Sequence, residues 1–254
     1  MSQSTRSATG ELTAFVLAGG FGTRLRSTTG EVAKVLAPID GRPFLCHLLD
    51  WLEKNGIRRV LLSLGHLADQ VIFFVRSNPR ETMQIDCVVE PEPLGTGGAI
   101  AYARHALDGD PVLVLNGDSL ADADLEGFVA QHVDGDHFAS ILCATVTDAA
   151  DYGRIETDEA GYVVNFHEKD PTFQGAGLVS CGVYLFSSDC LDHIAAENPR
   201  SLEEDYLCRL EAETLYCNAS ASDFIDIGTA ERFAWGQKRV PEIAGNKHKQ
   251  TGRA

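Results

Sequence analysis

Short apolar runs alternate with segments of helical periodicity through the first half of the chain, and no other feature limits the possible folds as strongly. The apolar runs, each read as a strand, are residues 13–17, 60–64, 87–89 and 111–115. They lack the strict alternation of a half-exposed strand, so we expect each to be buried on both faces. Strands of this kind with helices between them predict a doubly wound, Rossmann-like α/β fold with a mainly parallel sheet.

The segments between these runs carry the signals of helices and of their ends. Leu48, Leu49 and Leu52 lie at helical spacing. Pro43 suits the first turn of this helix, and Gly56 suits the position just past its end. Further helical segments are expected over residues 67–75 and from a glycine-rich start at 95–98.

The pattern becomes richer in strands from Phe138 onward. Residues 154–167 predict a hairpin that turns through residues 158–161. Ser201 and Glu204 have the spacing of a capping box, which predicts a helix through about Glu213. A last strand and turn are expected at residues 224–228.

The domain organisation follows from these patterns. We expect one domain over residues 12–240, with a first part at 12–137 and a β-rich second part at 138–240. Residues 1–11 and 241–254 are polar and aperiodic, so both ends are expected to be flexible.

The overall charge excludes one large class of partners. The chain has 254 residues, with 21 Lys and Arg against 37 Asp and Glu, and a formal net charge of −16 at pH 7. A surface that binds nucleic acid needs clustered basic residues, so we expect no nucleic-acid partner. A small phosphorylated ligand remains compatible, because a few cations and backbone N–H groups in one cleft can outweigh the global charge.

Cysteine usage and hydropathy indicate the compartment. The 7 cysteines form no CxxC pair and lie mostly among apolar neighbours, so we expect reduced, buried thiols. The N-terminus lacks a leader pattern and no apolar stretch approaches about 18 residues, so we expect no membrane partner and a cytoplasmic location. The 8 histidines show no zinc-type spacing with cysteine.

A glycine-rich turn directly follows the first apolar run, in the segment LAGGFGTRL at residues 17–25. Glycines there let backbone N–H groups approach a polyphosphate, and Arg24 adds a planar cationic donor. The turn has neither the spacing of a P-loop nor the GxGxxG spacing of a dinucleotide site, which disfavours a dehydrogenase. Taken alone, the segment is also compatible with an ordinary glycine turn.

Further motifs follow the turn, and together they favour a phosphate-binding turn over an ordinary glycine turn. They are VAKVLAPI at 32–39, EPEPLGTGGA at 90–99, LNGD at 115–118, DYG at 151–153, FHEK at 166–169 and DFIDIGT at 223–229. In this order, and with the turn, they make the chain resemble the sugar-1-phosphate nucleotidyltransferases from residue 13 to about residue 237. Within that family, GGFGTRL, EPLGTGGAI, LNGDS and DFIDIGT look most like the D-glycero-D-manno-heptose 1-phosphate guanylyltransferases.

The resemblance implies a reaction in which a sugar 1-phosphate oxygen attacks the α-phosphorus of a nucleoside triphosphate, giving a nucleotide sugar and pyrophosphate. GTP and a heptose 1-phosphate would give GDP-heptose. The nucleophile is already an anion, so the site must position two anions and neutralise charge rather than supply a general base. By the resemblance, the catalytic residues are Arg24, on the triphosphate, and Lys34, on the α-phosphate or the incoming phosphate.

The first part of the domain is expected to bind mainly the nucleotide. By the resemblance, Glu90 lies at the base edge, where its carboxylate can accept two hydrogen bonds from guanine but only one from uracil or thymine. This favours GTP, with UTP, CTP and dTTP as alternatives. The expected nucleotide-binding residues are Ala18, Gly19, Gly20, Gly22, Thr23, Arg24, Glu90, Gly95, Thr96 and Asn116.

The second part is expected to bind mainly the sugar phosphate, through Gly153, Glu168, Lys169 and Ser180. Ser180 stands where the relatives carry an asparagine, and Cys181 stands where they carry a glycine. The shorter side chain at 180 removes one donor, which leaves mannose or glucose 1-phosphate as alternatives to the heptose. Cys181 is expected to be a small packing residue rather than a nucleophile.

Two aspartates are the expected metal ligands. Asp118 follows an apolar strand, and Asp226 lies in the late strand and turn. Ligands of open α/β sheets bind beyond the carboxyl ends of strands, and Mg²⁺ commonly takes one or two carboxylates plus phosphate oxygens. The resemblance therefore implies magnesium as the cofactor, held by Asp118 and Asp226.

A non-catalytic nucleotide-sugar sensor is the alternative outside the enzymes. A degenerate relative of that kind is expected to lose the charged groups of the site, whereas Arg24, Lys34, Asp118 and Asp226 are all present. The oligomeric state stays open between monomer and homodimer, because no segment marks an interface.

Overall fold

The computed structural model describes residues 8–150, 152–167 and 170–245. Its strands are β1 (Thr13–Leu17), β2 (Pro38–Ile39), β3 (Arg42–Pro43), β4 (Arg59–Leu64), β5 (Gln84–Val89), β6 (Val112–Asn116), β7 (Ser119–Asp122), β8 (Ala139–Val146), β9 (Arg154–Thr157), β10 (Val163–His167), β11 (Gly177–Phe186), β12 (Leu215–Ala221) and β13 (Asp223–Asp226). Its α-helices are α1 (Arg26–Thr29), α2 (Phe44–Lys54), α3 (Ala68–Ser77), α4 (Gly95–Ala103), α5 (Leu125–Asp134), α6 (Ser188–Glu197) and α7 (Ala230–Gly245).

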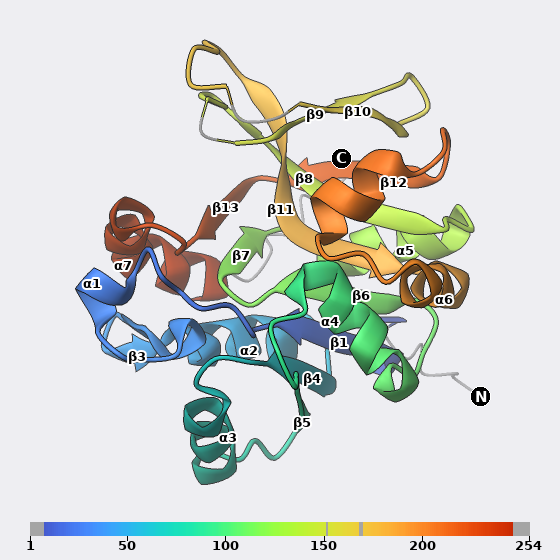
Figure 1. Ribbon diagram of the computed structural model, residues 1–254. Coiled ribbons are helices and arrows are strands. Elements are labelled where there is room, and N and C mark those ends of the chain that lie inside the picture. Colours follow the sequence, from blue (N-terminus) through green and yellow to red (C-terminus); the bar gives the residue numbers. More distant parts are fainter. Residues whose placement is uncertain (1–7, 151, 168–169, 246–254) are drawn as a thin grey trace, which may run out of the picture.

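The centre of the molecule is a parallel sheet with the strand order β6-β1-β4-β5 (Figure 1). The predicted α/β fold with a mostly parallel central sheet is confirmed. The predicted strand at 87–89 is longer, because β5 already begins at Gln84. As the terminal strand of this order, β5 carries the exposed polar residues Gln84 and Asp86, which a search for apolar runs passes over.

Helices cover both faces of this sheet, as its sequence pattern requires. Along β1, Ala14 and Val16 pack into one hydrophobic cluster while Phe15 packs into another, because successive side chains of a strand point to opposite faces. The first cluster includes side chains of α2, α3, α5 and α7, and the second those of α4 and α6.

The helix ends of α2 agree with their sequence signals to within one residue. Pro43 is the residue before the first helical residue, Phe44, and Gly56 has a φ of +87° just past the end. The N–H groups of Gly56 and Ile57 donate to the carbonyls of Glu53 and Leu52. Glycine adopts this left-handed conformation without steric cost, which ends the helix and starts the turn into β4.

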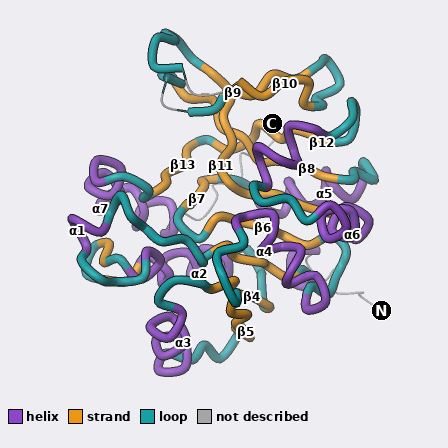
Figure 2. The backbone as a smooth tube through the Cα atoms, in the orientation of Figure 1, coloured by secondary structure: helices purple, strands orange, loops and turns teal. Residues whose placement is uncertain are grey.

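The long strand β11 joins the central sheet to the β-rich part. Its second half pairs with β6 and β8, and its first half pairs with β8 and β9. The register with β8 shifts between Ser180 and Val183, and Gly182 there has a φ of +70°. Such an irregularity bends a strand, and the β9–β10 hairpin accordingly projects beyond the helical layers, at the top of Figure 2. The predicted hairpin at 154–167 is confirmed.

The predicted helix from Ser201 to about Glu213 is wrong in length. A π turn at Leu202–Tyr206 and a 3₁₀ turn at Leu207–Arg209 take its place. Ser201 does cap the segment by accepting the N–H of Glu204 at 3.0 Å, but Asp205 rather than Glu204 accepts the N–H of Ser201, at 2.8 Å. The segment packs on α4 through buried Leu202 and Tyr206, so tertiary contacts select a short, wide turn over a regular helix.

Regular structure continues past both expected ends of the domain, residues 12 and 240. A 3₁₀ turn spans Ala8–Glu11, and α7 continues to Gly245 with Ile243 and Ala244 buried. Residues 241–245 therefore continue an amphipathic helix that packs against α2. The rest of the predicted flexible ends, 1–7 and 246–254, lies outside the described residues.

The cysteines agree with the expectation of reduced, mostly buried thiols. All 7 cysteines are free; Cys208 is the exposed exception among otherwise buried or half-buried side chains. In the described ranges, no helix combines the length and the apolar character needed to cross a membrane.

Candidate functional site

Two adjoining cavities lie beyond the carboxyl ends of the central strands. The smaller, about 530 Å³, is lined by the turn after β1, by Glu90 after β5 and by the start of α4. The larger, about 880 Å³, is lined by β11, by the end of β13 and by the segment from Ser201 to Cys208. The side chains or backbones that line both are Gly22, Lys34, Asn116, Asp118 and Glu203.

The structure gathers every described residue that the sequence analysis selected. The smaller cavity contains Ala18, Gly19, Gly20, Gly22, Lys34, Glu90, Gly95, Thr96, Asn116 and Asp118. The larger cavity contains Gly22, Thr23, Arg24, Lys34, Asn116, Asp118, Gly153, Ser180 and Asp226. The expected division between nucleotide and sugar residues thus follows the two cavities, except that Thr23 and Arg24 face the larger one. Glu168 and Lys169 lie outside the described residues.

The glycine-rich turn packs closely against its neighbours. A Cβ on Gly19 would lie 2.6 Å from Glu90 Oε1, and a Cβ on Gly22, whose φ is +59°, would lie 3.3 Å from Lys34 Cβ. A side chain at position 19 would have to displace the Glu90 carboxylate, and one at position 22 would be tight against Lys34 and strained by the positive φ. The turn therefore keeps its backbone against Glu90 on one side and Lys34 on the other.

Glu90 links this turn to α4. Its Oε1 accepts the hydroxyl of Ser63 at 3.0 Å, and its Oε2 accepts the N–H of Leu94 at 3.2 Å. A carboxylate offers about four acceptor positions, so two hydrogen bonds within the protein leave acceptor capacity toward the smaller cavity. The carboxylate is thereby held in one orientation at the wall where a base would lie.

The start of α4 meets the segment that follows α6. Gly95 has a φ of +80°, and a Cβ there would lie 2.2 Å from the carbonyl oxygen of Arg200. The Thr96 hydroxyl accepts the N–H of Leu202 at 2.8 Å. The Thr96 side chain thus links α4 to the segment after α6. The lack of a side chain at Gly95 permits this close packing beside the cavity.

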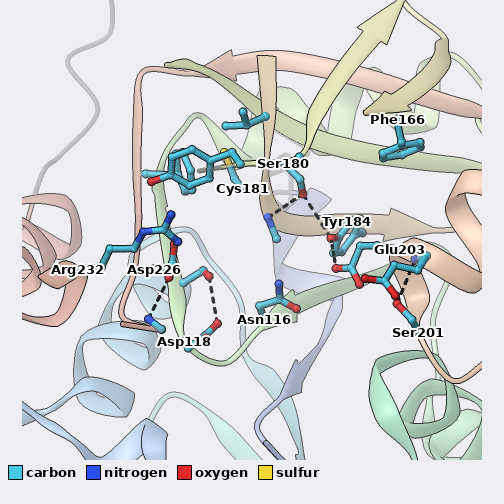
Figure 3. Close-up of a pocket in the computed structure, with 18 of the residues that line it drawn as sticks. Asn116, Asp118, Phe166, Ser180, Cys181, Tyr184, Ser201, Glu203, Asp226 and Arg232 are labelled. Carbon is cyan, nitrogen blue, oxygen red and sulfur yellow. Dashed lines mark hydrogen bonds and ion pairs between the residues drawn. The ribbon is translucent and has the colours of Figure 1, made fainter. Parts of the chain in front are cut away.

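Asn116 ends β6 at the junction of the two cavities (Figure 3). A Cβ on Gly182 would lie 2.5 Å from Asn116 Nδ2, so the bulge of β11 leaves the space that the Asn116 side chain occupies. Gly117 follows, with its N–H donating to the carbonyl of Leu17 at 2.9 Å. The ends of β1 and β6 are thereby fixed next to each other.

Asp118 and Asp226 come together because β13 pairs with β7. The antiparallel register places Asp226 opposite Ser119, and the Ile227 N–H donates to the carbonyl of Asp118 at 2.9 Å. A Cβ on Gly228 would lie 2.9 Å from Asp226 Oδ1, 3.5 Å from Lys34 Nζ and 3.9 Å from Asp118 Oδ2. Two carboxylates and one ammonium group therefore face the space beside Gly228.

Each of these carboxylates has a cationic partner. Lys34 Nζ forms an ion pair with Asp118 Oδ2, and Arg232 Nη1 donates to Asp226 Oδ2 at 2.6 Å. The guanidinium of Arg232 also lies 4.4 Å from the ring centroid of Tyr152. Figure 3 shows Asp118, Asp226 and Arg232 on the same side of the cavity. Lys34 and Arg232 are cationic donors of the kind that binds phosphate oxygens, and in this structure the two carboxylates compensate their charge.

The donor set fits a magnesium ion. Mg²⁺ prefers hard oxygen ligands and takes one or two carboxylates, with phosphate oxygens and water in the other positions. Asp118 and Asp226 supply two carboxylates toward the space beside Gly228, where a Cβ would crowd them. Among the described residues, His, Cys, Asp and Glu form no group of 3 or more that would make a cage of protein ligands.

The other end of the larger cavity carries hydroxyl groups. Ser180 Oγ accepts the N–H of Gly182 at 3.0 Å and lies 3.3 Å from the hydroxyl of Tyr184. The Tyr184 hydroxyl donates to Glu203 Oε1 at 2.7 Å. Burial and the nearby Glu203 carboxylate raise the pKa of Tyr184 well above its usual value, so this hydroxyl keeps its proton. Ser180, a predicted sugar-binding residue, thus belongs to a connected polar chain.

Sequence reasoning missed several side chains of the larger cavity, namely Tyr152, Phe166, Tyr184, Glu203 and Arg232. Glu203 lies inside the capping-box segment, where the pattern was attributed to the helix start alone. Arg232 lies in the first turn of α7, and its pairing with Asp226 at the end of β13 depends on where that helix starts.

Cys181 lines the larger cavity but is only 1% exposed as a residue. Burial raises the pKa of its thiol, so the nucleophilic thiolate is disfavoured. The prediction that Cys181 is a small packing residue agrees with this environment.

Comparison with known proteins gives consistent matches. The family model described as nucleotidyl transferase matches residues 13–241. The chain is 32% identical over 231 residues to the D-glycero-alpha-D-manno-heptose 1-phosphate guanylyltransferase of Aneurinibacillus thermoaerophilus, covering 89% of this chain and 97% of that protein. It is 34% identical over 232 residues to probable mannose-1-phosphate guanylyltransferase 2 of Arabidopsis thaliana, covering 88% of this chain and 63% of that protein.

A solved structure shares the fold. The crystal structure of HddC from Yersinia pseudotuberculosis complexed with GMP-PN superposes with a TM-score of 0.79 at 32% sequence identity. The match covers 90% of this chain and 99% of that chain. The fold similarity therefore extends over both cavities and not only over the parallel sheet.

Proposed function

Because this chain belongs to the nucleotidyl transferase family, we propose that it transfers GMP from GTP to a heptose 1-phosphate, giving GDP-heptose and pyrophosphate. The observation that carries the proposal is the meeting of the two cavities at Lys34, Asn116 and Asp118. Two phosphorylated substrates that bind on either side of this junction would bring their reacting phosphates together there.

The reaction needs in-line attack and charge neutralisation. An oxygen of the sugar phosphate forms a bond to the α-phosphorus, and the bond from that phosphorus to the bridging oxygen of pyrophosphate breaks. Lys34 lies at the junction, so its ammonium group can leave Asp118 for the α-phosphate as negative charge develops there. Arg24 lines the larger cavity and would bind phosphate oxygens at its edge.

The preference for guanine rests on Glu90 and on the relatives. Its carboxylate is held by Ser63 and Leu94 at the wall of the smaller cavity and has acceptor capacity for guanine N1–H and N2–H. Both relatives described above are named as guanylyltransferases, and HddC was crystallised with GMP-PN.

The observations constrain the identity of the sugar 1-phosphate less than that of the nucleotide. The heptose is favoured by the likeness to the heptose 1-phosphate guanylyltransferase of Aneurinibacillus thermoaerophilus, which extends over nearly the whole length of that protein. Mannose 1-phosphate is the second candidate, because the Arabidopsis relative is 34% identical to this chain. Ser180, with its short side chain, borders the cavity in which the two sugars would be distinguished.

Magnesium is the proposed cofactor. Asp118 and Asp226 would hold it together with phosphate oxygens of the substrates. When bound, it would neutralise charge on the phosphate oxygens of the nucleotide. The cationic partners of the two aspartates, Lys34 and Arg232, would then be available to the substrate phosphates.

The proposal is tested by measuring pyrophosphate release with magnesium for GTP, UTP, CTP, ATP and dTTP against heptose, mannose and glucose 1-phosphates. We expect the highest rate for GTP with the heptose 1-phosphate, and background rates when the sugar phosphate is omitted. A highest rate with mannose 1-phosphate would replace the sugar and keep the reaction. Absence of pyrophosphate release from folded protein in every combination would refute the proposed activity.

A further inference from the structure

The larger cavity has two chemically different ends. The cation Arg232 lies at one end, beside Asp118 and Asp226, whereas Tyr184 and Glu203 lie at the opposite end (Figure 3). A sugar 1-phosphate has the same division, with one anionic group and a ring that carries hydroxyls. The cations Lys34 and Arg232 at the first end are the donors that suit the phosphate, so the ring would lie toward Tyr184 and Glu203.

A chain of hydrogen bonds ends at the Glu203 carboxylate. The Gly182 N–H donates to Ser180 Oγ, and the Tyr184 hydroxyl donates its single proton to Glu203 Oε1 at 2.7 Å. With that proton committed, the 3.3 Å contact between the hydroxyls of Ser180 and Tyr184 assigns Ser180 as the donor. In each hydrogen bond of this series, the donor therefore lies on the Gly182 side and the acceptor on the Glu203 side.

The backbone of Glu203 is held as firmly as its side chain. It lies in the π turn at Leu202–Tyr206, whose start is fixed by the cap at Ser201 and by the bond from the Leu202 N–H to Thr96. The Tyr184 ring is fully buried, so its hydroxyl cannot move away from Glu203 without breaking core packing. The carboxylate is thus presented to the cavity in a fixed orientation.

The Glu203 carboxylate has more acceptor capacity than Tyr184 uses. A carboxylate has about four acceptor positions, and an occupied cavity would exclude the water that fills the others. A half-buried acceptor that loses water without gaining a donor is costly, so the bound ligand has to supply a hydroxyl or N–H group there. The chemistry that fits is a sugar hydroxyl.

We propose that Glu203 accepts a hydrogen bond from a ring hydroxyl of the acceptor sugar and thereby contributes to sugar specificity, with Tyr184 as its positioning residue. This inference rests on the proposed function. Ribose hydroxyls of the nucleotide are the other source of the same chemistry, because Glu203 also borders the smaller cavity. The acceptor sugar is favoured because Ser180, Tyr184 and the apolar ring of Phe166 border only the larger cavity.

The test compares Glu203→Gln with wild type in steady-state kinetics. Glutamine keeps the shape and an acceptor oxygen for Tyr184, but its second position becomes an NH₂ donor that cannot accept a sugar hydroxyl. We expect kcat/KM for the sugar 1-phosphate to fall about tenfold to a hundredfold, mainly through KM, while KM for GTP stays within twofold. Glu197→Gln, on the exposed end of α6 and outside both cavities, is the matched control and should behave as wild type.

Monodeoxy analogues of the accepted sugar 1-phosphate identify the hydroxyl. The analogue that lacks the group bound by Glu203 should be a poor substrate for wild type and should lose nothing further with Glu203→Gln. Tyr184→Phe keeps the packing and removes the positioning bond, so we expect a smaller rise in the same KM with unchanged kcat. This variant also serves as the test if Glu203→Gln does not fold.

Several outcomes would overturn the inference. An unchanged KM for the sugar phosphate in Glu203→Gln would remove Glu203 from sugar binding. A rise confined to KM for GTP, with 2′- or 3′-deoxy-GTP insensitive to the substitution, would assign the carboxylate to the ribose instead. A wild-type protein without transferase activity would refute the proposed function itself, which separates the two failures.

Discussion

Replacement of Gly95 by alanine tests the packing that forms the nucleotide side of the site. Gly95 has a φ of +80°, and an added Cβ would lie 2.2 Å from the carbonyl oxygen of Arg200. The left-handed conformation costs about 1–2 kcal/mol for a residue with a Cβ. Relief of the backbone clash adds about 1–3 kcal/mol, as in overpacked cores. We therefore expect Gly95→Ala to lower the free energy of unfolding by about 2–5 kcal/mol.

The measurement is thermal unfolding followed by circular dichroism at one scan rate. For a domain of this size the expected change lowers Tm by roughly 5–15 °C. Gly20→Ala is the matched control, because no atom lies within 4 Å of its added Cβ and its φ is not positive. Gly95→Ala should also raise KM for GTP, since the start of α4 borders the smaller cavity. Equal Tm values for the two variants would contradict the close approach of α4 to Arg200.

Four further predictions concern charge. Lys34→Ala should lower kcat by a hundredfold or more with Tm nearly unchanged, because its ion pair is partly exposed to solvent and because, in the proposed mechanism, its ammonium group would face the reacting phosphate; a kcat near wild type would remove Lys34 from the mechanism. Asp226→Asn should weaken Mg²⁺ binding in the presence of GTP about tenfold in calorimetry, and an unchanged titration would refute its role as a ligand. Glu90→Gln should reduce the preference for GTP over UTP in kcat/KM, because an amide has one acceptor oxygen instead of two; an unaltered ranking of nucleotides would count against base recognition by Glu90. Burial lowers the pKa of His132 to about 4, so below pH 6.5 the unfolded chain binds a proton that the folded chain does not, and stability should fall by about 2 kcal/mol between pH 6.5 and 5. Urea unfolding should show a smaller decrease in the free energy of unfolding between pH 6.5 and 5 for His132→Leu than for wild type. Equal decreases in the two proteins would show that other groups cause the pH dependence.

Local sequence patterns predicted the structure correctly where interactions over a few residues decide it. The apolar run Thr13–Leu17 is a strand, and Gly56 ends α2 in the left-handed conformation. Both outcomes follow from local chemistry, since a run of apolar residues requires burial and a positive φ favours glycine. The described residues that the motifs selected also lie around the two cavities, because the motifs follow the ends of the strands whose carboxyl edges meet.

The local patterns failed where packing decides the extent of an element. The capping box at Ser201 predicts a regular helix, but contacts with α4 select a π turn that ends at Tyr206 and a 3₁₀ turn that ends at Arg209. Residues 241–245 are polar enough to resemble a tail, yet Ile243 and Ala244 are buried in α7. In both cases the deciding contacts join segments far apart in the chain.

By itself, the sequence determined the strands of the parallel sheet, their order along the chain and the types of side chain available for the chemistry. Only the tertiary structure decided which of these groups meet. Asp118 and Asp226 become neighbours through the register of β7 and β13, and Glu203 receives its orientation from Tyr184. The physical reason is range: dihedral preferences and periodicity act over a few residues, whereas strand register and buried hydrogen bonds depend on the whole packed core.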